Sequence, residues 1–173
     1  GIKKTDPILI FHPGASCPSK IWPYERFAQV AAALAKRHGF KVFVAAGAGE
    51  RPLAEKMVRQ MHQAAVNLAG EISLSQLASL MRRARLFISN DSGPLHLAAA
   101  VGLPLVAIFS RNEAGLSPRR WGPLGEKVRI LHREVGCPTC LAHDCRRAFA
   151  CLMAIRTEDV LDAADSLLQE HNP

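Results

Sequence analysis

The sequence predicts an α/β protein with a Rossmann-like, doubly wound parallel sheet. Short apolar segments alternate with amphipathic helical patterns along the whole chain. In these segments apolar residues follow one another without alternating with polar ones, which is typical of strands buried on both faces of a sheet. Three of them end in small turns that contain glycine. A chain of 173 residues with this repeating order indicates one domain over residues 1–173.

The first expected strand is Ile8–His12, an apolar run that is ended by Pro13. A helix over Trp22–His38 follows, because Pro23 suits a helix start and the apolar residues recur at intervals of three and four. Gly39 is typical of the position after a last helical turn.

The next expected strand, Lys41–Ala46, runs into the glycine turn 47–49. We expect a helix over Pro52–Ala65 and a short strand over Val66–Ala69. Ser73 and Gln76 have the spacing of a capping box, which predicts that another helix begins there and continues through Met81.

The stretch 86–109 predicts a buried strand, a polar turn, a short helix and a second buried strand. We expect irregular structure over Ser110–Lys127 and a last strand over Val128–Leu131. The chain closes with an amphipathic helix over Thr157–Glu170, for which Thr157 is the expected N-cap.

Composition favours anionic partners. The formal net charge is +7, which suits nucleotides, phosphorylated glycans, nucleic acid or an acidic membrane surface. The basic residues are mostly scattered pairs and only 6% of residues are aromatic, which argues against a nucleic-acid-binding platform. No apolar run approaches the roughly 20 residues of a membrane span, and no leader segment is expected.

The most informative feature is the turn Asp91-Ser92-Gly93, which Pro94 and His96 follow. A carboxylate, a hydroxyl and free backbone N–H groups are expected together at a helix N-terminus, beyond the carboxyl end of a strand. Ligands of open α/β sheets bind at this edge, and a helix N-terminus favours phosphate. A nucleotide or sugar-phosphate site is therefore predicted here.

The loop after the first strand is a second candidate phosphate contact. Gly14 lets the backbone approach a ligand closely, Ser16 can donate a hydrogen bond to phosphate oxygens and Lys20 can neutralise their charge. The spacing of a P-loop is absent. A lysine in a loop is often simply solvated. The hypothesis of a phosphate contact in this loop is therefore supported only in combination with the turn at Asp91.

The segment Gly47-Ala-Gly-Glu-Arg51 resembles half of a dinucleotide fingerprint, but the third glycine is missing, so NAD is disfavoured. Glu50 suits two roles equally well. It can accept hydrogen bonds from ribose hydroxyls, or it can interact only with the dipole of the helix that follows.

Four cysteines, Cys137, Cys140, Cys145 and Cys151, lie within fifteen residues and enclose His143. Four thiols this close can hold a structural zinc ion. The spacing is not that of a zinc ribbon or finger. Reduced thiols in a compact loop and disulfides are the alternatives, and a cytosolic setting disfavours disulfides.

Two motifs resemble those of a known family. His12-Pro-Gly-Ala-Ser with Lys20-x-Trp-Pro, and Ser89-Asn-Asp-Ser-Gly-Pro-Leu-His96, are similar to the C-terminal half of the ADP-heptose:lipopolysaccharide heptosyltransferases, glycosyltransferase family 9. The resemblance covers nearly the whole chain, including the stretch from Ile72 and the cysteine-rich tail.

The resemblance implies one half of a GT-B fold, in which two Rossmann-like domains face each other across a cleft. This chain would be the domain that binds the nucleotide-sugar donor. The catalytic base would lie in an N-terminal domain that also binds the lipopolysaccharide-core acceptor, so this fragment alone would be inactive and would contain no catalytic residue. The implied activity is inverting transfer of heptose from ADP-heptose without a metal or other cofactor. The implied location is the cytoplasm, with peripheral contact at the cytoplasmic face of the bacterial inner membrane.

The resemblance also implies roles for individual residues. The donor phosphates would lie on the loop that begins at Gly14, against Ala15, Ser16 and Lys20. The diphosphate and sugar would lie beside the second motif, the adenine against the backbone near Ile72, and the ribose near Glu50. In the second motif the implied contacts are Asp91, Ser92 and Gly93, with support from His96.

Two alternatives stay open on the sequence. One is a UDP-sugar epimerase-like domain of the same GT-B architecture, which would prefer UDP to ADP. The other is a non-catalytic basic module that binds zinc and nucleic acid; steep salt dependence of binding would support it.

Overall fold

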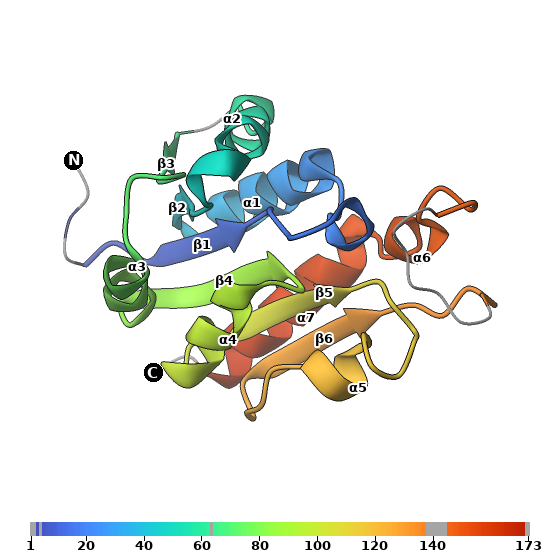
Figure 1. Ribbon diagram of the computed structural model, residues 1–173. Coiled ribbons are helices and arrows are strands. Elements are labelled where there is room, and N and C mark those ends of the chain that lie inside the picture. The colour runs from blue at the N-terminus through green and yellow to red at the C-terminus, as the bar shows by residue number, and fades with distance from the viewer. Residues whose placement is uncertain (1–2, 4, 63, 138–144, 172–173) are drawn as a thin grey trace.

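Six parallel strands form the sheet of the computed structural model, which describes residues 3, 5–62, 64–137 and 145–171 (Figure 1). The spatial order is β3-β2-β1-β4-β5-β6, and every neighbouring pair is parallel. This confirms the Rossmann-like doubly wound prediction. The strands are β1 (Ile8–His12), β2 (Lys41–Val44), β3 (Ala65–Asn67), β4 (Ala84–Asn90), β5 (Leu105–Phe109) and β6 (Val128–His132).

The order of the strands reverses at β1. The chain first moves outward through β2 and β3, and then returns to the other side of β1 with β4, β5 and β6. A crevice opens at such a switch point, outside the carboxyl ends of the strands. The loops that follow β1, β2 and β4 therefore meet at one edge, and these loops contain the predicted site residues.

Helices cover both faces of the sheet (Figure 1). One core lies under α1 (Tyr24–His38), α2 (Arg51–Gln60) and α7 (Thr157–Glu170). The other lies under α3 (Leu74–Met81) and α4 (Gly93–Ala100). The short elements are η1 (Pro18–Lys20), η2 (Ala48–Glu50), α5 (Pro118–Trp121) and α6 (Ala150–Met153).

The side chains of β1 alternate between these two cores. Leu9 and Phe11 belong to the core under α1 and α7, whereas Ile8 and Ile10 belong to the core under α3 and α4. All four are buried, as the continuous apolar pattern predicted. The same alternation directs His12, the last residue of β1, toward the α3 and α4 side of the sheet.

Several predicted boundaries are wrong by a few residues. The first helix begins at Tyr24 rather than Trp22, because Trp22 is drawn into the core. The second helix ends at Gln60 rather than Ala65, and His62 after it has a left-handed φ of 51° that a continuing helix does not allow. The following strand is Ala65–Asn67, one residue earlier than expected at its start.

The predicted N-cap of the last helix is also wrong. Thr157 is the first helical residue, and the preceding Arg156 occupies the cap position. The backbone N–H of Arg156 donates to the carboxylate of Asp159 at 2.7 Å, so an acidic side chain in the first turn supplies the capping contact. In the stretch expected to be irregular, the structure has the short helix α5.

Trp22 connects the loop after β1 to the segment just before α7. Its side chain is fully buried, and the indole N–H donates to the carbonyl oxygen of Ile155 at 3.0 Å. The ring meets Phe27 edge to face, with 5.0 Å between ring centroids. This combination of packing and a satisfied indole N–H fixes the exit of the loop that carries Lys20.

Replacing Trp22 with alanine is therefore expected to lower the free energy of unfolding by about 3–5 kcal/mol, because it leaves a large cavity. The change is measured by urea unfolding. Trp121→Phe is the control, since Trp121 is 45% exposed, and we expect its effect to stay within about 0.5 kcal/mol. Equal losses in the two variants would contradict this role for Trp22.

Candidate functional site

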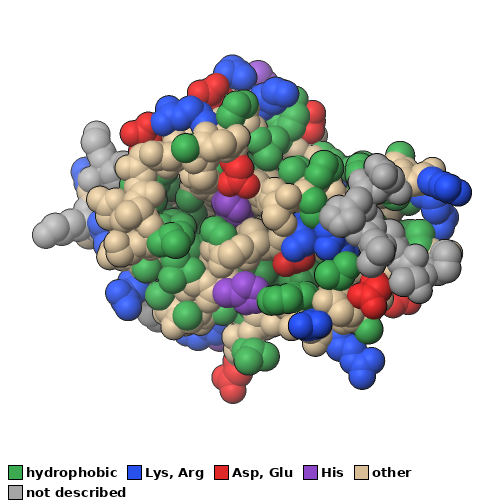
Figure 2. Space-filling model, viewed as in Figure 1, with side chains coloured by type: hydrophobic (Ala, Val, Ile, Leu, Met, Phe, Trp, Pro, Cys, Tyr) green, Lys and Arg blue, Asp and Glu red, His purple; other side chains and the backbone are tan. Residues whose placement is uncertain are grey.

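A pocket of about 520 Å³ lies at the carboxyl ends of β1, β2 and β4. Acidic, basic and histidine side chains meet near the middle of this face (Figure 2). Most of the predicted site residues line it together: Ala15, Ser16, Lys20, Glu50, Asp91, Ser92, Gly93 and His96. The structure thus brings three separate sequence segments to one place.

Five lining residues were not among the predicted ones: His12, Gly47, Leu74, Pro94 and Trp121. Two predicted residues lie outside the pocket lining. Gly14 lies behind the carboxylate of Glu50, and Ile72 packs at the margin of the core under α3.

Lys20 and Asp91 form an ion pair across the pocket. The Lys20 Nζ and Asp91 Oδ2 are 2.7 Å apart, and the two side chains are 17% and 8% exposed. The pair joins the loop after β1 to the turn after β4. An ammonium group has three donors, so Lys20 keeps hydrogen-bonding capacity for an anionic ligand.

The start of α4 is open toward the pocket. Its N-cap residue, Ser92, makes no capping bond to the helix, and a methyl group built on Gly93 would meet nothing within 4 Å. The Ser92 hydroxyl instead pairs with that of Ser89 at 2.9 Å. Pro94 has no N–H and the N–H of Leu95 donates to the carbonyl oxygen of Ser92 at 3.3 Å, so the N–H of Gly93 is the first-turn donor that remains for an anion, which the helix dipole favours.

Asn90 holds the loop after β1 in place. Its fully buried amide donates to the carbonyl oxygen of Pro13 at 2.7 Å and accepts from the backbone N–H of Trp22 at 3.1 Å. Sequence reasoning passed over Asn90. The sequence does show that a polar residue ends an apolar strand here. The partners of Asn90 could not be found from this, because they lie 68 and 77 residues away in the chain.

Two residues after β5 brace the same loop. The hydroxyl of Ser110 donates to the carbonyl oxygen of Ser19 at 2.5 Å. The buried guanidinium of Arg111 donates to the sulfur of Cys17 at 2.7 Å and to the Ser19 hydroxyl at 3.1 Å. The loop is thus fixed from β4 and β5 together, and Lys20 follows directly from the braced segment.

Glu50 is positioned by two glycines. Its Oε2 accepts from the backbone N–H of Gly47 at 2.9 Å. A Cβ at Gly14 would lie 2.0 Å from Oε1 of Glu50, so only glycine leaves room for this carboxylate. The group close to Gly14 in the structure is the Glu50 side chain, and the approach of a ligand to this glycine stays a prediction.

His12 lies at the floor of the pocket, where its ring is 4% exposed. Its Nδ1 is 2.9 Å from the carbonyl oxygen of Ala45. Burial lowers the pKa of His12 below its ordinary 6.5, while the Ala45 carbonyl and the charge of Glu50 act in the opposite direction. The ring is accordingly neutral at pH 7.

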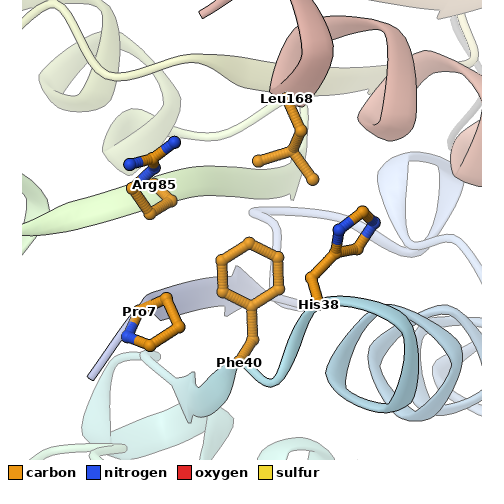
Figure 3. Close-up of a pocket in the computed structure, with 5 residues that line it drawn as sticks. All are labelled: Pro7, His38, Phe40, Arg85 and Leu168. Carbon is orange, nitrogen blue, oxygen red and sulfur yellow. The ribbon is translucent and has the colours of Figure 1, made fainter. Parts of the chain in front are cut away.

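A second cavity, of about 280 Å³, lies at the opposite end of the sheet (Figure 3). The Phe40 ring lies between Pro7 and His38, with Arg85 and Leu168 across from it. His38 is paired with Asp165, at 2.7 Å. Unlike the pocket at the carboxyl ends of the strands, its lining residues include no lysine, no serine and no start of a helix.

The cysteine segment is only partly described. Cys137, Cys145 and Cys151 are each half-buried, while Cys140 and His143 lie outside the described residues. Among the residues that the structure describes, no three histidine, cysteine or acidic side chains are close enough to hold a metal ion. The zinc hypothesis at these four cysteines stays a prediction. In the same described part of the chain, no helix has the length and apolarity to cross a membrane.

The doubly wound parallel sheet, with a pocket at its switch point, defines a Rossmann-like α/β domain. Residues 1–149 match the family model "Glycosyltransferase family 9 (heptosyltransferase)". The chain belongs to this family, as the sequence motifs predicted.

Curated relatives include the lipooligosaccharide heptosyltransferase 2 of Haemophilus influenzae, 33% identical over 72% of this chain and 36% of that protein. The lipopolysaccharide heptosyltransferase 2 of Salmonella typhimurium is 29% identical over 95% of this chain and 47% of its own length. Among solved structures, the E. coli ADP-heptose lps heptosyltransferase II superposes with a TM-score of 0.79 at 26% identity, covering 99% of this chain and 49% of that one. The chain therefore spans about half or less of these relatives.

The lowered pKa of His12 gives a prediction about stability. The unfolded chain takes up a proton near pH 6.5, whereas the folded ring resists it, so the free energy of unfolding is expected to fall as the pH falls below about 6.5. Urea unfolding between pH 5 and 8 measures this, and His12→Asn should weaken the dependence.

The ring itself can be followed by NMR. Glu50→Gln is expected to lower the pKa of His12 further, because it removes the negative charge that raises it. A His12 ring that titrates at or above 6.5 in the folded protein would contradict the assignment.

Proposed function

We propose that residues 1–173 form the donor-binding half of an inverting glycosyltransferase that transfers heptose from ADP-heptose to a lipopolysaccharide-core acceptor. The observation that carries the proposal is the convergence of Lys20 and the open start of α4 on one pocket at the switch point. Family membership and the names of the relatives supply the chemical class of the donor.

In this proposal the diphosphate lies between the loop after β1 and the turn after β4. Lys20 neutralises its charge together with the dipole of α4, Ser16 and the N–H of Gly93 donate hydrogen bonds to phosphate oxygens, and Ser92 lies beside them. Ala15 contributes through its backbone. These groups take the place that a metal ion has in other nucleotide sites, so the reaction needs no added cofactor.

The reaction inverts the anomeric carbon of the transferred sugar. The acceptor oxygen forms a bond to this carbon as the bond to the ADP phosphate oxygen breaks. Negative charge grows on the leaving diphosphate, where Lys20 and the α4 dipole stabilise it more strongly than in the ground state.

The base that accepts the acceptor's proton is proposed to come from the other half of the enzyme. Two carboxylates of the described chain line the pocket, and both have partners: Asp91 pairs with Lys20, and Glu50 accepts from Gly47. Each carboxylate thus already holds a group of the pocket itself, which favours a base from outside this chain. The chain alone is therefore expected to bind donor without transferring sugar.

The partners follow from the same proposal. The donor binds this chain, and the acceptor binds through the other half at the cytoplasmic face of the inner membrane, with peripheral contact only. The two alternatives lack comparable support, because the family model and the relatives' names indicate heptosyltransferases. These alternatives are a UDP-sugar epimerase-like domain and a module that binds zinc and nucleic acid.

The proposal is tested by calorimetric titration of the chain with ADP, UDP and NAD. We expect selective binding of ADP. Lys20→Ala should weaken ADP binding about 10- to 100-fold, the range for a lost hydrogen bond between charged groups. The matched control is Lys56→Ala, because Lys56 lies on α2 outside the pocket lining and should leave the affinity unchanged.

A preference for UDP would contradict the proposal that ADP-heptose is the donor, and would support the hypothesis of a UDP-sugar epimerase-like domain. Absence of ADP binding by a folded chain would contradict the donor-binding role itself. Because Lys20→Ala leaves the buried Asp91 unpaired, a loss of about 2 kcal/mol in the free energy of unfolding is also expected, and affinity is measured below the unfolding transition.

A further inference from the structure

The two walls of the pocket have opposite hydrogen-bonding character. On one side, Lys20 and the start of α4 present donors, which suit phosphate. On the other side stand His12 and Glu50, which are neighbours close enough for the Glu50 charge to act on the pKa of the ring. A phosphate group would be repelled by a carboxylate, so this second wall must face another part of the ligand.

The tautomer of His12 follows from its protein contact. A carbonyl oxygen only accepts hydrogen bonds, so at 2.9 Å from the Ala45 oxygen the ring nitrogen Nδ1 must carry the proton. A neutral ring with its proton on Nδ1 has a lone pair on Nε2. His12 therefore offers an acceptor, and only an acceptor, at its second nitrogen.

The groups beside His12 do not supply a donor. The Glu50 carboxylate accepts hydrogen bonds, and one of its oxygens already takes the Gly47 N–H. Ser89 is the register partner of His12 on β4, and its hydroxyl donates to the carbonyl oxygen of Asn90 at 2.8 Å. Among the described residues, the hydrogen bond given for the His12 ring is the one at Nδ1, and because His12 lines the pocket, Nε2 is available to a donor of a bound molecule.

We infer that Nε2 of His12 accepts a hydrogen bond from a sugar hydroxyl of the bound nucleotide sugar, beside Glu50. Two adjacent acceptors match the neighbouring hydroxyl groups of a sugar, which are hydrogen-bond donors and carry no charge. The hydroxyl belongs either to the ribose or to the transferred sugar. This inference rests on the proposed donor-binding function and adds a specificity-determining residue to it.

His12→Asn is the sharpest variant for this test. The asparagine amide nitrogen can occupy the place of Nδ1 and keep the hydrogen bond to Ala45, while the acceptor at Nε2 is lost. The matched control is His38→Asn, because His38 lies at the end of α1 and lines the cavity at the opposite end of the strands (Figure 3). Thermal unfolding of both variants checks that the fold is kept.

Calorimetry compares four ligands: ADP, 2′-deoxy-ADP, 3′-deoxy-ADP and ADP-heptose. If the hydroxyl belongs to the ribose, the wild-type chain should bind the deoxy nucleotide that lacks it about tenfold more weakly than ADP, and His12→Asn should abolish the difference for that nucleotide and not for the other. If it belongs to the transferred sugar, His12→Asn should weaken ADP-heptose about tenfold and leave ADP unchanged. His38→Asn should reproduce the wild-type affinities.

Wild-type affinities in His12→Asn for all four ligands would overturn the inference. An equal loss for all four would also overturn it, because no single hydroxyl would then be coupled to His12. In both cases ADP binding by the wild-type chain would leave the proposed function standing. A folded wild-type chain that binds none of the four ligands would overturn the proposed function and this inference with it.

Discussion

The buried amide of Asn90 is the contact on which the candidate site depends. It ends β4, accepts from Trp22 and donates to Pro13, and so fixes the loop after β1 against the neighbouring strand. Without it, two buried backbone groups of that loop would lose their partners, at a cost of about 1–3 kcal/mol each. The ion pair between Lys20 and Asp91 forms between the two segments that Asn90 joins.

Once the loop is fixed, the pocket acquires two chemically distinct sides. Lys20 and the start of α4 form a cationic side, and His12 with Glu50 forms a side that accepts hydrogen bonds. A nucleotide sugar has the matching distribution, with charge on the diphosphate and neutral hydroxyls on the sugars. Asp91 is paired with Lys20 and one oxygen of Glu50 accepts from Gly47, which favours the proposal that another half of the enzyme supplies the base.

The local parts of this arrangement were predictable from sequence. Continuous apolar runs identified β1, β4 and β5, and the turn at Asp91 identified the ligand edge, because both signals lie within a few neighbouring residues. The contacts of Asn90, Ser110 and Arg111 were not predictable, since they join segments far apart in the chain. His12 was missed because it ends an apolar strand, and only the paired sheet shows which face its ring occupies. The cap of α7 was assigned wrongly because Thr157 is a common N-cap residue, whereas Asp159 makes the contact.

The most direct test of this account is a crystal structure of the chain with ADP bound. We expect the diphosphate to lie between Lys20 and the N-terminus of α4, and the ribose to lie on the side of Glu50 and His12. Diphosphate bound in the cavity around Phe40, or against the Glu50 carboxylate, would contradict it.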